Sequence, residues 1–498
     1  MKKVVGLILT LALWFGAAAQ SPSNTVTVAV GVDATAFDPW LSTNTTDKHV
    51  VSHVFDTLLK RNADMEVVPN LAISYEATSD TVWHFTLRDD VYFTDGEHLT
   101  AADVAYTLAH LRAEELRAPS IAQFDLITEV EVLGDYSFNI VTEEPFPALP
   151  AVLSEFWIVP QHHTEAVGTL ELSRNPVGSG PYKLVDWVRD SHMLLQANED
   201  WWNGKPAVEF VEFRVVPEQN ARIAQIQTGE ADIVAQIPVE SLAMIERSGR
   251  ASVKEATGPR SYFVGFDTTR DGPLQDPLVR QALNYAVNVE EIIDVVFDGR
   301  GVELATIVTP EQFGFHDGLA PLGYDPERAQ ELLAEAGYPD GLTFSMEAPI
   351  ARYPKDSEIA QVIAGQLSAV GVTVNLDIVE WGTYVGQFGR GETPDLYFLG
   401  WSIPTFDPDA LLTPLLLSGY PYSRFSDDVL SEQIREARSL VNPEERAALY
   451  HEIQEGMQEL APMVFLFQLN EIYGVSNRIN WEPRADERIY LWETSFTE

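Results

Sequence analysis

Three short stretches of the sequence carry residue types that enzymes use for catalysis. The stretch HEIQE, from His451 to Glu455, is close to the helical motif that binds zinc through two histidines, but its fifth residue is a glutamate. The stretch GWSIP, at 400–404, lacks the second glycine of the turn that presents a nucleophilic serine. The adjacent pair His162 and His163 has no other histidine at metal-ligand spacing. None of these stretches completes a catalytic motif, so we expect no enzymatic activity, cofactor or metal.

Aromatic residues favour ligand binding instead. Trp381 lies in DIVEWGTYVGQF and Trp401 in LYFLGWSIPTFDPDALLTPLL, each near the end of an expected strand. Open α/β sheets bind their ligands at the carboxyl ends of strands, and small-molecule clefts combine aromatic walls with a few polar groups. We therefore expect Trp381 and Trp401 to contact a ligand.

The N-terminal segment and the overall composition indicate an exported protein. The first residues, MKKVVGLILTLALWFGAAAQ, combine two lysines, an apolar run and small residues, which predicts a signal peptide over residues 1–19. No later apolar run is long enough to span a membrane. The 498-residue chain has no cysteine to carry a lipid anchor, so we expect a periplasmic protein. A formal charge of −43 argues against nucleic acid and anionic lipid as partners.

Local signals predict a mixed α/β fold with two lobes. Aspartate or asparagine caps followed by apolar periodicity predict helices after Asp276, Asn288 and Asp325, the last ending near Gly337. A helix followed by a strand at 372–378 is typical of an open α/β sheet. Strands dominate residues 25–260 and helices 273–460, and the last part returns to strand-like sequence. Two crossing segments would make a hinge.

The stretch WHFTLRDDVYFTDGEHLTAADVAYTL, at 83–108, is the densest pattern in the chain. Alternation at 83–87 and at 91–93 predicts two short strands. Thr100 and Asp103 form an expected capping box, after which apolar residues recur at helical spacing. The pattern alone leaves open whether its carboxylates form a site or serve only as turn and cap residues.

Five motifs in order resemble those of the extracytoplasmic solute-binding proteins, family 5, the peptide and nickel branch that serves ABC importers. They are the stretch at 83–108, NPVGSGPYKLVDW, NARIAQIQTGEADIV, DPLVRQALNYAVNVEEI and YDPERAQELLAEAGYPDG. The resemblance implies a monomer with two α/β lobes, a hinge, a ligand in the cleft and permease subunits as partners. We expect lobe I at 20–268 and 468–498, with an inserted subdomain at about 48–165, and lobe II at 269–467.

The resemblance also implies ligand contacts. Peptide binders of this family hold the peptide ammonium with an aspartate three residues after the tryptophan of the GW motif, where this chain has Pro404. Asp407 could replace that aspartate, or it could cap a helix that begins at Pro408. Arg352 is the candidate for the peptide carboxylate. The expected set of ligand contacts is completed by Phe37, Tyr353 and Ile403.

Several ligands and activities stay open at this point. A peptide or related small organic solute is the leading prediction, and an oligosaccharide stacked on tryptophan is the alternative. Nickel or a metal chelate would need histidine or carboxylate ligands that do not cluster in the expected cleft loops. A secreted hydrolase or a periplasmic chaperone is supported only by the export signal and the many carboxylates.

Overall fold

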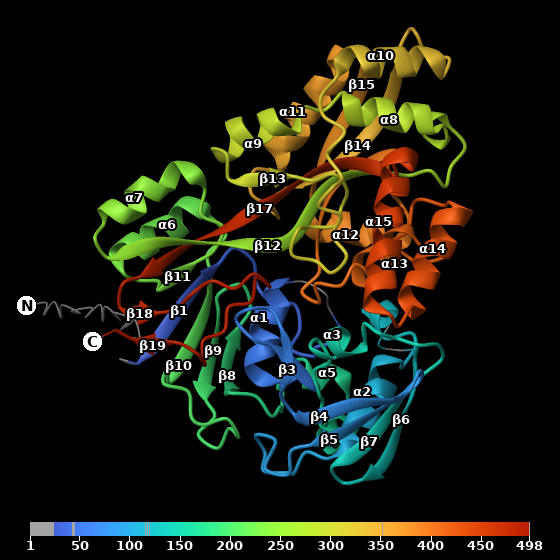
Figure 1. Ribbon diagram of the computed structural model, residues 1–498. Helices are drawn as coiled ribbons and strands as arrows, with labels where there is room; N and C mark the ends of the chain where they lie inside the picture. The colour runs from blue at the N-terminus through green and yellow to red at the C-terminus, as the bar shows by residue number, and fades with distance from the viewer. Residues whose placement is uncertain are drawn as a thin grey trace, which may run out of the picture.

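The computed structural model describes residues 24–41, 45–114, 116, 118, 120–350 and 352–497, so the expected signal peptide lies outside the described residues. One large sheet runs through the molecule (Figure 1). Its strand order is β15 (Val372–Glu380), β14 (Leu342–Ile350), β16 (Leu396–Ser402), β12 (Ala251–Phe266), β17 (Met463–Ser476), β11 (Ile233–Val234), β1 (Thr25–Val30), β10 (Phe210–Val215), β9 (His192–Ala197) and β8 (Tyr182–Val188), and β13 (Gly301–Glu303) pairs with β17. The predicted mixed α/β fold is confirmed.

The two long strands β12 and β17 join the halves of the molecule (Figure 1). They pair antiparallel from Ala251 to Thr257, and the register then shifts before it resumes at Ser261. Beyond the shift β12 also pairs with β16. A break in the ladder is where two crossing strands can bend most easily. We propose that the lobes meet at residues 258–260 and 469, so the first crossing precedes the expected boundary at 268.

The first lobe carries helices on its half of the sheet and an added subdomain. Its helices are α1 (Thr45–Val54), α3 (Leu149–Leu153), α4 (Gln161–Val167), α5 (Thr169–Leu172), α6 (Gln219–Thr228) and α7 (Leu242–Arg247), with 3-10 turns at Ile121–Gln123 and Val239–Ser241. A two-stranded sheet, β2 (Leu59–Arg61) and β3 (Val67–Pro69), leads to the subdomain. The last segment, with β18 (Ile479–Asn480) and β19 (Ser495–Phe496), packs Trp481, Ile489 and Leu491 into the core of this lobe.

The subdomain contains the densest sequence pattern. Its sheet has the order β4 (Ala72–Ser79), β5 (Val82–Leu87), β7 (Ser137–Thr142), β6 (Ile127–Gly134), and α2 (Ala101–Leu111) packs beside it. The capping box of Thr100 and Asp103 is confirmed. The prediction of a second strand at 91–93 is wrong, because this segment forms only one isolated β-bridge, between Tyr92 and His98. The Asp95-Gly96 turn folds it back after two residues, which leaves no length for a ladder.

The second lobe is built from helices around its half of the sheet. They are α8 (Pro277–Tyr285), α9 (Val289–Phe297), α10 (Pro326–Glu335), α11 (Asp356–Ala369), α12 (Trp381–Arg390), α13 (Asp409–Leu416), α14 (Asp428–Ser439) and α15 (Pro443–Leu460), preceded by a 3-10 turn at Pro273–Gln275. The predicted caps Asp276, Asn288 and Asp325 each accept a backbone N–H of the first turn. Gly337 follows α10 with a φ of 92°, which only glycine adopts freely.

Candidate functional site

A buried ion pair marks the point where the chain crosses between the lobes. Arg260, on β12 just after the register shift, donates from Nη2 to Oε2 of Glu487 over 2.7 Å. The two side chains are only 7% and 6% exposed. The second amino group of Arg260 donates to the carbonyl oxygen of Gly400 over 3.2 Å. The pair therefore ties the hinge strand to the C-terminal segment and to the GW motif, and its charges largely neutralise each other.

Arg352 lies near the ion pair of Arg260 and Glu487, but it has no ion-pair partner of its own among the described residues. Its guanidinium carbon is 4.8 Å from the ring centre of Tyr353 and 5.0 Å from that of Trp381. No hydrogen bond or ion pair of the guanidinium is found among the described residues, and its buried Nε has no partner. Burial lowers the pKa of the Arg352 guanidinium, and the positive charge of Arg260 adds to this. A desolvated cation without a counter-charge is suited to bind an acid group.

His49 on α1 faces this region from the first lobe. Burial, together with the positive charges of Arg488 and Arg352, lowers the pKa of the His49 imidazole to about 3. The ring is therefore neutral at pH 7. Its Nδ1 atom is buried and has no hydrogen-bond partner. A neutral imidazole carries one hydrogen-bond donor and one acceptor, so His49 has an unused polar atom within electrostatic reach of Arg352.

Glu471 on β17 is the second charged side chain without a partner. Burial raises the pKa of the Glu471 carboxyl, and the negative charge of Glu487 raises it further, while Arg260 and Arg352 act in the opposite direction. No hydrogen bond or ion pair of its carboxylate is found among the described residues. We call His49, Arg260, Arg352, Glu471 and Glu487 the cleft cluster.

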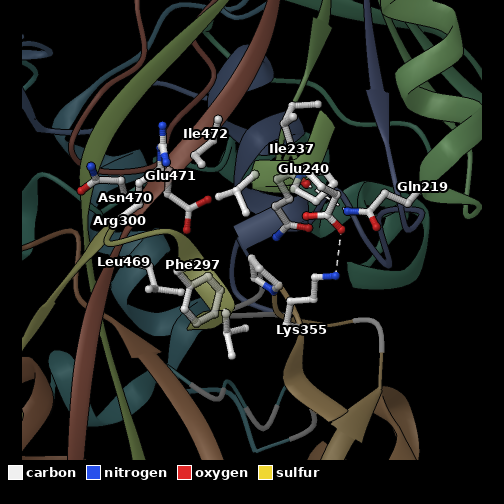
Figure 2. Close-up of a pocket in the computed structure, with 15 residues that line it drawn as sticks. Gln219, Ile237, Glu240, Phe297, Arg300, Lys355, Leu469, Asn470, Glu471 and Ile472 are labelled. Carbon is white, nitrogen blue, oxygen red and sulfur yellow. Dashed lines mark hydrogen bonds and ion pairs between the residues drawn. The ribbon is translucent and has the colours of Figure 1, made fainter. Parts of the chain in front are cut away.

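A pocket opens beside the cleft cluster, between the lobes. Its empty space amounts to about 530 Å³ when the adjoining open solvent is included, and about 50 Å³ of this can hold the centres of water-sized molecules. Figure 2 shows its walls, with Ile237 and Glu240 from the first lobe, Phe297 and Lys355 from the second, and Leu469 and Glu471 from β17. Lys355 bridges the lobes by an ion pair of 2.9 Å to Glu240. We call this space the hinge pocket.

The structure brings four of the predicted site residues together. Tyr353 donates from its hydroxyl to the carbonyl oxygen of Gly400 over 2.9 Å, next to Trp401. Trp381, the first residue of α12, lies edge-on to the ring of Tyr353 at 6.0 Å. Trp401 is half-buried and packs edge-on against Tyr422. Arg352, Tyr353, Trp381 and Trp401 therefore line one region at the ends of β14, β15 and β16.

The other three predicted residues lie elsewhere. Phe37 has no exposed surface and packs edge-on against Trp187 in the first lobe. Ile403 is 1% exposed in the core of the second lobe. Asp407 makes two hydrogen bonds of 2.8 Å with the buried Arg446 and accepts the N–H of Asp409 at the start of α13. Asp407 therefore has the capping role, and its charge is already neutralised within its own lobe.

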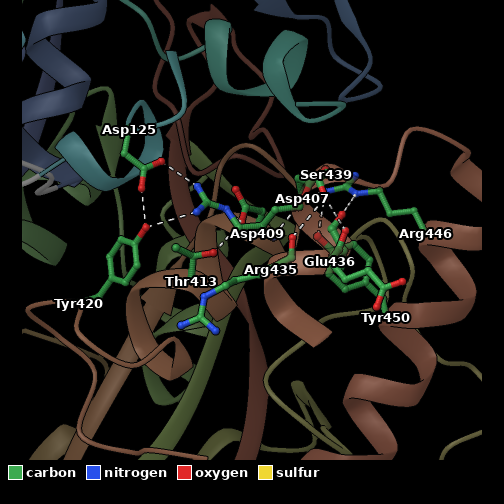
Figure 3. A network of polar contacts seen from close by, with 12 residues as sticks. Asp125, Asp407, Asp409, Thr413, Tyr420, Arg435, Glu436, Ser439, Arg446 and Tyr450 are labelled. Carbon is green, nitrogen blue, oxygen red and sulfur yellow. Dashed lines mark hydrogen bonds and ion pairs between the residues drawn. The ribbon is translucent and has the colours of Figure 1, made fainter. Parts of the chain in front are cut away.

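A second set of contacts holds the lobes together at the far side of the cleft. Figure 3 shows Asp125 of the inserted subdomain beside Tyr420 of the second lobe, whose hydroxyl donates to the Asp125 carboxylate. Arg438 lies 2.8 Å from Asp125 and 2.8 Å from Asp409. Arg61 of the first lobe also donates to the carbonyl oxygen of Thr405. These contacts join the two lobes directly.

The stretches that resemble enzyme motifs have structural roles. Nε2 of His451 donates to the carbonyl oxygen of Phe315 over 3.2 Å, and the imidazole ring of His451 stacks on that of His316. His162 pairs with Asp95 over 2.7 Å at a turn of the subdomain. Within the described part of the chain, no group of three or more histidine or acidic side chains is arranged to hold a metal ion.

No helix in the described part of the chain is long and apolar enough to cross a membrane.

The hinged lobes, the unpaired charges and the pocket between them define a protein that binds a small solute. The comparisons with known proteins agree. A model of the bacterial extracellular solute-binding proteins, family 5, middle region, matches residues 66–423. The chain belongs to this family, whose members deliver solutes to ABC importers.

Individual relatives match almost the whole chain. The glutathione-binding protein GsiB of Salmonella typhimurium is 28% identical over 475 residues, 92% of this chain and 91% of that protein. The periplasmic binding protein DppA of Helicobacter pylori, solved with the peptide STSA, is 25% identical, with a TM-score of 0.86 over 94% of this chain and 98% of that one. A dipeptide-binding protein of Pseudoalteromonas sp. SM9913, solved with Met-Leu, has a TM-score of 0.87 at 22% identity, over 95% of this chain and all of that one. These relatives are binding proteins rather than enzymes.

Sequence reasoning did not find His49, Arg260, Glu471 or Glu487. Each lies in a different segment, and no local motif surrounds any of them. The one nearby feature that the sequence did show is the glycine of the GW motif, Gly400. The structure explains this glycine, because a Cβ atom there would lie 2.8 Å from the ring of Tyr262. The glycine of the GW motif is therefore required for close packing, which places the hinge strand β12 against Trp401.

Proposed function

We propose that the chain captures a peptide or a related small organic acid between its lobes in the periplasm and releases it unaltered to an importer. The observation that carries the proposal is the desolvated guanidinium of Arg352, which lies near two aromatic rings and has no carboxylate partner among the described residues. A solute carboxylate would supply the missing counter-charge, a contact that contributes about 1.5 to 3 kcal/mol.

The aromatic neighbours of Arg352 fit the rest of such a solute. Trp381 and Trp401 are half-buried, so each keeps surface for an apolar or amide group of the ligand. His49 adds a neutral hydrogen-bonding ring from the opposite lobe. Binding by both lobes explains how a solute stabilises the closed state, because only closure brings these groups together.

Peptides are favoured over sugars and metals as ligands. Two of the similar proteins carry peptide ligands in their structures, and a third is named for glutathione, itself a short peptide. A sugar offers no charge for Arg352 to bind, and a bare metal cation would be repelled by it. We infer that the protein acts as a monomer, since the cleft is complete within one chain.

Calorimetric titration of refolded, ligand-stripped protein tests the proposal. The panel contains Met-Leu, Ser-Thr-Ser-Ala, glutathione, their C-terminal amides and neutral oligosaccharides. We expect heat from at least one free acid and at least tenfold weaker binding of its amide. Equal binding of acid and amide, or binding of the oligosaccharides alone, would contradict the role of Arg352. Chromatography of the mixture after incubation checks that the solute is unchanged, and any product would indicate an enzyme.

A further inference from the structure

We propose that Glu471, supported by Glu487, forms a subsite for a cationic nitrogen of the solute, an ammonium or a guanidinium. This inference rests on the proposed function, because it names the second chemical group of the same ligand.

The charges of the cleft cluster are the first part of the argument. Arg260 and Glu487 are paired with each other at 2.7 Å. His49 is neutral at pH 7 because burial lowers its pKa to about 3. The Arg352 guanidinium and the Glu471 carboxyl then remain, each without a hydrogen bond or ion pair among the described residues. A solute with one acid group and one cationic nitrogen complements both.

The arrangement around Gly258 is the second part. A Cβ atom on Gly258 would lie 3.1 Å from Cγ of Glu471 and 3.2 Å from Oε1 of Glu487. The two glutamates therefore converge over the backbone at the hinge. Oε1 of Glu487 is buried and has no hydrogen-bond partner, although the other oxygen of the same carboxylate is bound by Arg260. A buried acceptor left unsatisfied points to a donor that the closed protein does not itself supply.

The hinge pocket is the third part. Its other charged side chains are paired, Lys355 with Glu240 and Arg300 with Glu255 and Asp298. Glu471 is the exception among the charged residues that line it. Figure 2 shows its carboxylate turned from β17 toward the pocket space, with apolar side chains such as Phe297 around it. An ammonium on an apolar body fits this environment better than a hydrated metal ion does.

The experiment compares peptides with a free and a blocked amino group. The probes are Met-Leu and N-acetyl-Met-Leu, titrated against the wild-type protein, Glu471→Gln and the control Glu482→Gln. Glu482 is 80% exposed and lies outside the cleft, so it loses the same charge without touching the solute. We expect at least tenfold stronger binding of the free amine by the wild type and the control, and a ratio near one for Glu471→Gln. An unchanged ratio in a folded Glu471→Gln protein overturns the subsite.

Two further measurements separate this inference from the proposed function. Mass spectrometry identifies the solute that co-purifies with the native protein. A solute with an acid group but no basic nitrogen overturns the cation subsite and leaves the proposed function standing, whereas a solute without an acid group overturns both. Titration with Ca²⁺ and Mg²⁺ alone is the last arm. If the wild type binds either ion at micromolar concentration and Glu471→Gln does not, the subsite binds a metal ion rather than an ammonium, and the assignment is overturned.

Folding of the variant is checked by circular dichroism and thermal unfolding. Glu471→Gln removes a desolvated charge that repels Glu487, so the ligand-free variant should unfold at a higher temperature than the wild type. A gain in stability combined with a loss of amine recognition is the expected pattern. A structural residue would give a loss of both, which would overturn the proposal.

Discussion

The guanidinium of Arg438 in the second lobe lies 2.8 Å from the carboxylate of Asp125 in the inserted subdomain. The hydroxyl of Tyr420 donates to the same carboxylate. Because Asp409 holds Arg438 from its own lobe, the guanidinium is already in place to receive Asp125 when the lobes approach. We infer that this contact gives the inserted subdomain a part in closing the cleft.

Removal of that contact should weaken solute binding. In Asp125→Asn the closed state loses a partly exposed ion pair that contributes about 1 kcal/mol, which corresponds to about a fivefold lower affinity. Faster dissociation should account for most of the change, which stopped-flow fluorescence measures. Glu129→Gln, an exposed change on the neighbouring strand β6, is the control. An affinity equal to that of the control would show that the contact does not support closure.

Arg352→Met should lower the affinity for free acids about tenfold to a hundredfold, because a charge-assisted hydrogen bond of about 1.5 to 3 kcal/mol is lost. Since the Arg352 guanidinium has no carboxylate partner among the described residues, the substitution breaks no ion pair there and the fold should persist. Calorimetry with Met-Leu and its C-terminal amide measures the effect. Retention of full affinity for the acid would exclude Arg352 from the site.

Trp401→Ala tests the aromatic wall of the cleft. The half-buried ring has surface left for a solute, and its loss should cost about 1 to 3 kcal/mol of binding free energy. The measurement is calorimetry on protein whose circular dichroism matches the wild type. If the affinity is unchanged, the ring contacts Tyr422 alone and does not contact the solute.

Asp407→Ala should affect folding rather than binding. It leaves Arg446 buried without a counter-charge, and breaking such a pair costs about 3 to 5 kcal/mol of the free energy of unfolding. Urea unfolding measures that loss, and calorimetry at low temperature should give an affinity within about twofold of the wild type, less than about 0.4 kcal/mol. A loss of affinity with normal stability would instead make Asp407 the ammonium acceptor.

The pH dependence of stability provides a test of Glu471. Burial and the negative charge of Glu487 raise its pKa in the folded protein, whereas Arg260 and Arg352 lower it. An acid with a raised pKa stabilises the fold below its ordinary pKa, near 4.5, and this contribution is lost as the pH rises toward neutrality. Ligand-free Glu471→Gln should therefore gain in melting temperature over the wild type as the pH rises from 5 to 8. A constant difference would contradict the raised pKa.

Local patterns were sufficient to predict much of the fold. The caps at Asp276, Asn288 and Asp325 depend on backbone groups two or three residues away, so the sequence alone determines them. The strand β15 buries Val372 and half-buries alternate residues, as its period predicts. The short segment at 91–93 was misjudged because a strand also needs a partner, and its turn leaves room for one bridge.

The site could be predicted only in part, because its charges come from distant segments. The sequence near Asp407 fits both a helix cap and a ligand contact. Only the structure shows that Arg446, 39 residues later, neutralises its charge. Arg260, Glu471 and Glu487 meet only because β12 and β17 cross at the hinge. No hydrophobic periodicity or motif spacing in the sequence predicts a contact between such distant segments. Arg352 was found through the family resemblance, and the structure adds that its guanidinium has no ion-pair partner in the described part of the chain.

The central claim is that the lobes close around a small solute, and small-angle X-ray scattering tests it most directly. The ligand-stripped protein is measured alone and then with the solute released from the native protein added back. The account predicts a smaller radius of gyration that saturates at one solute per chain. Identical scattering curves with and without a bound solute would contradict it.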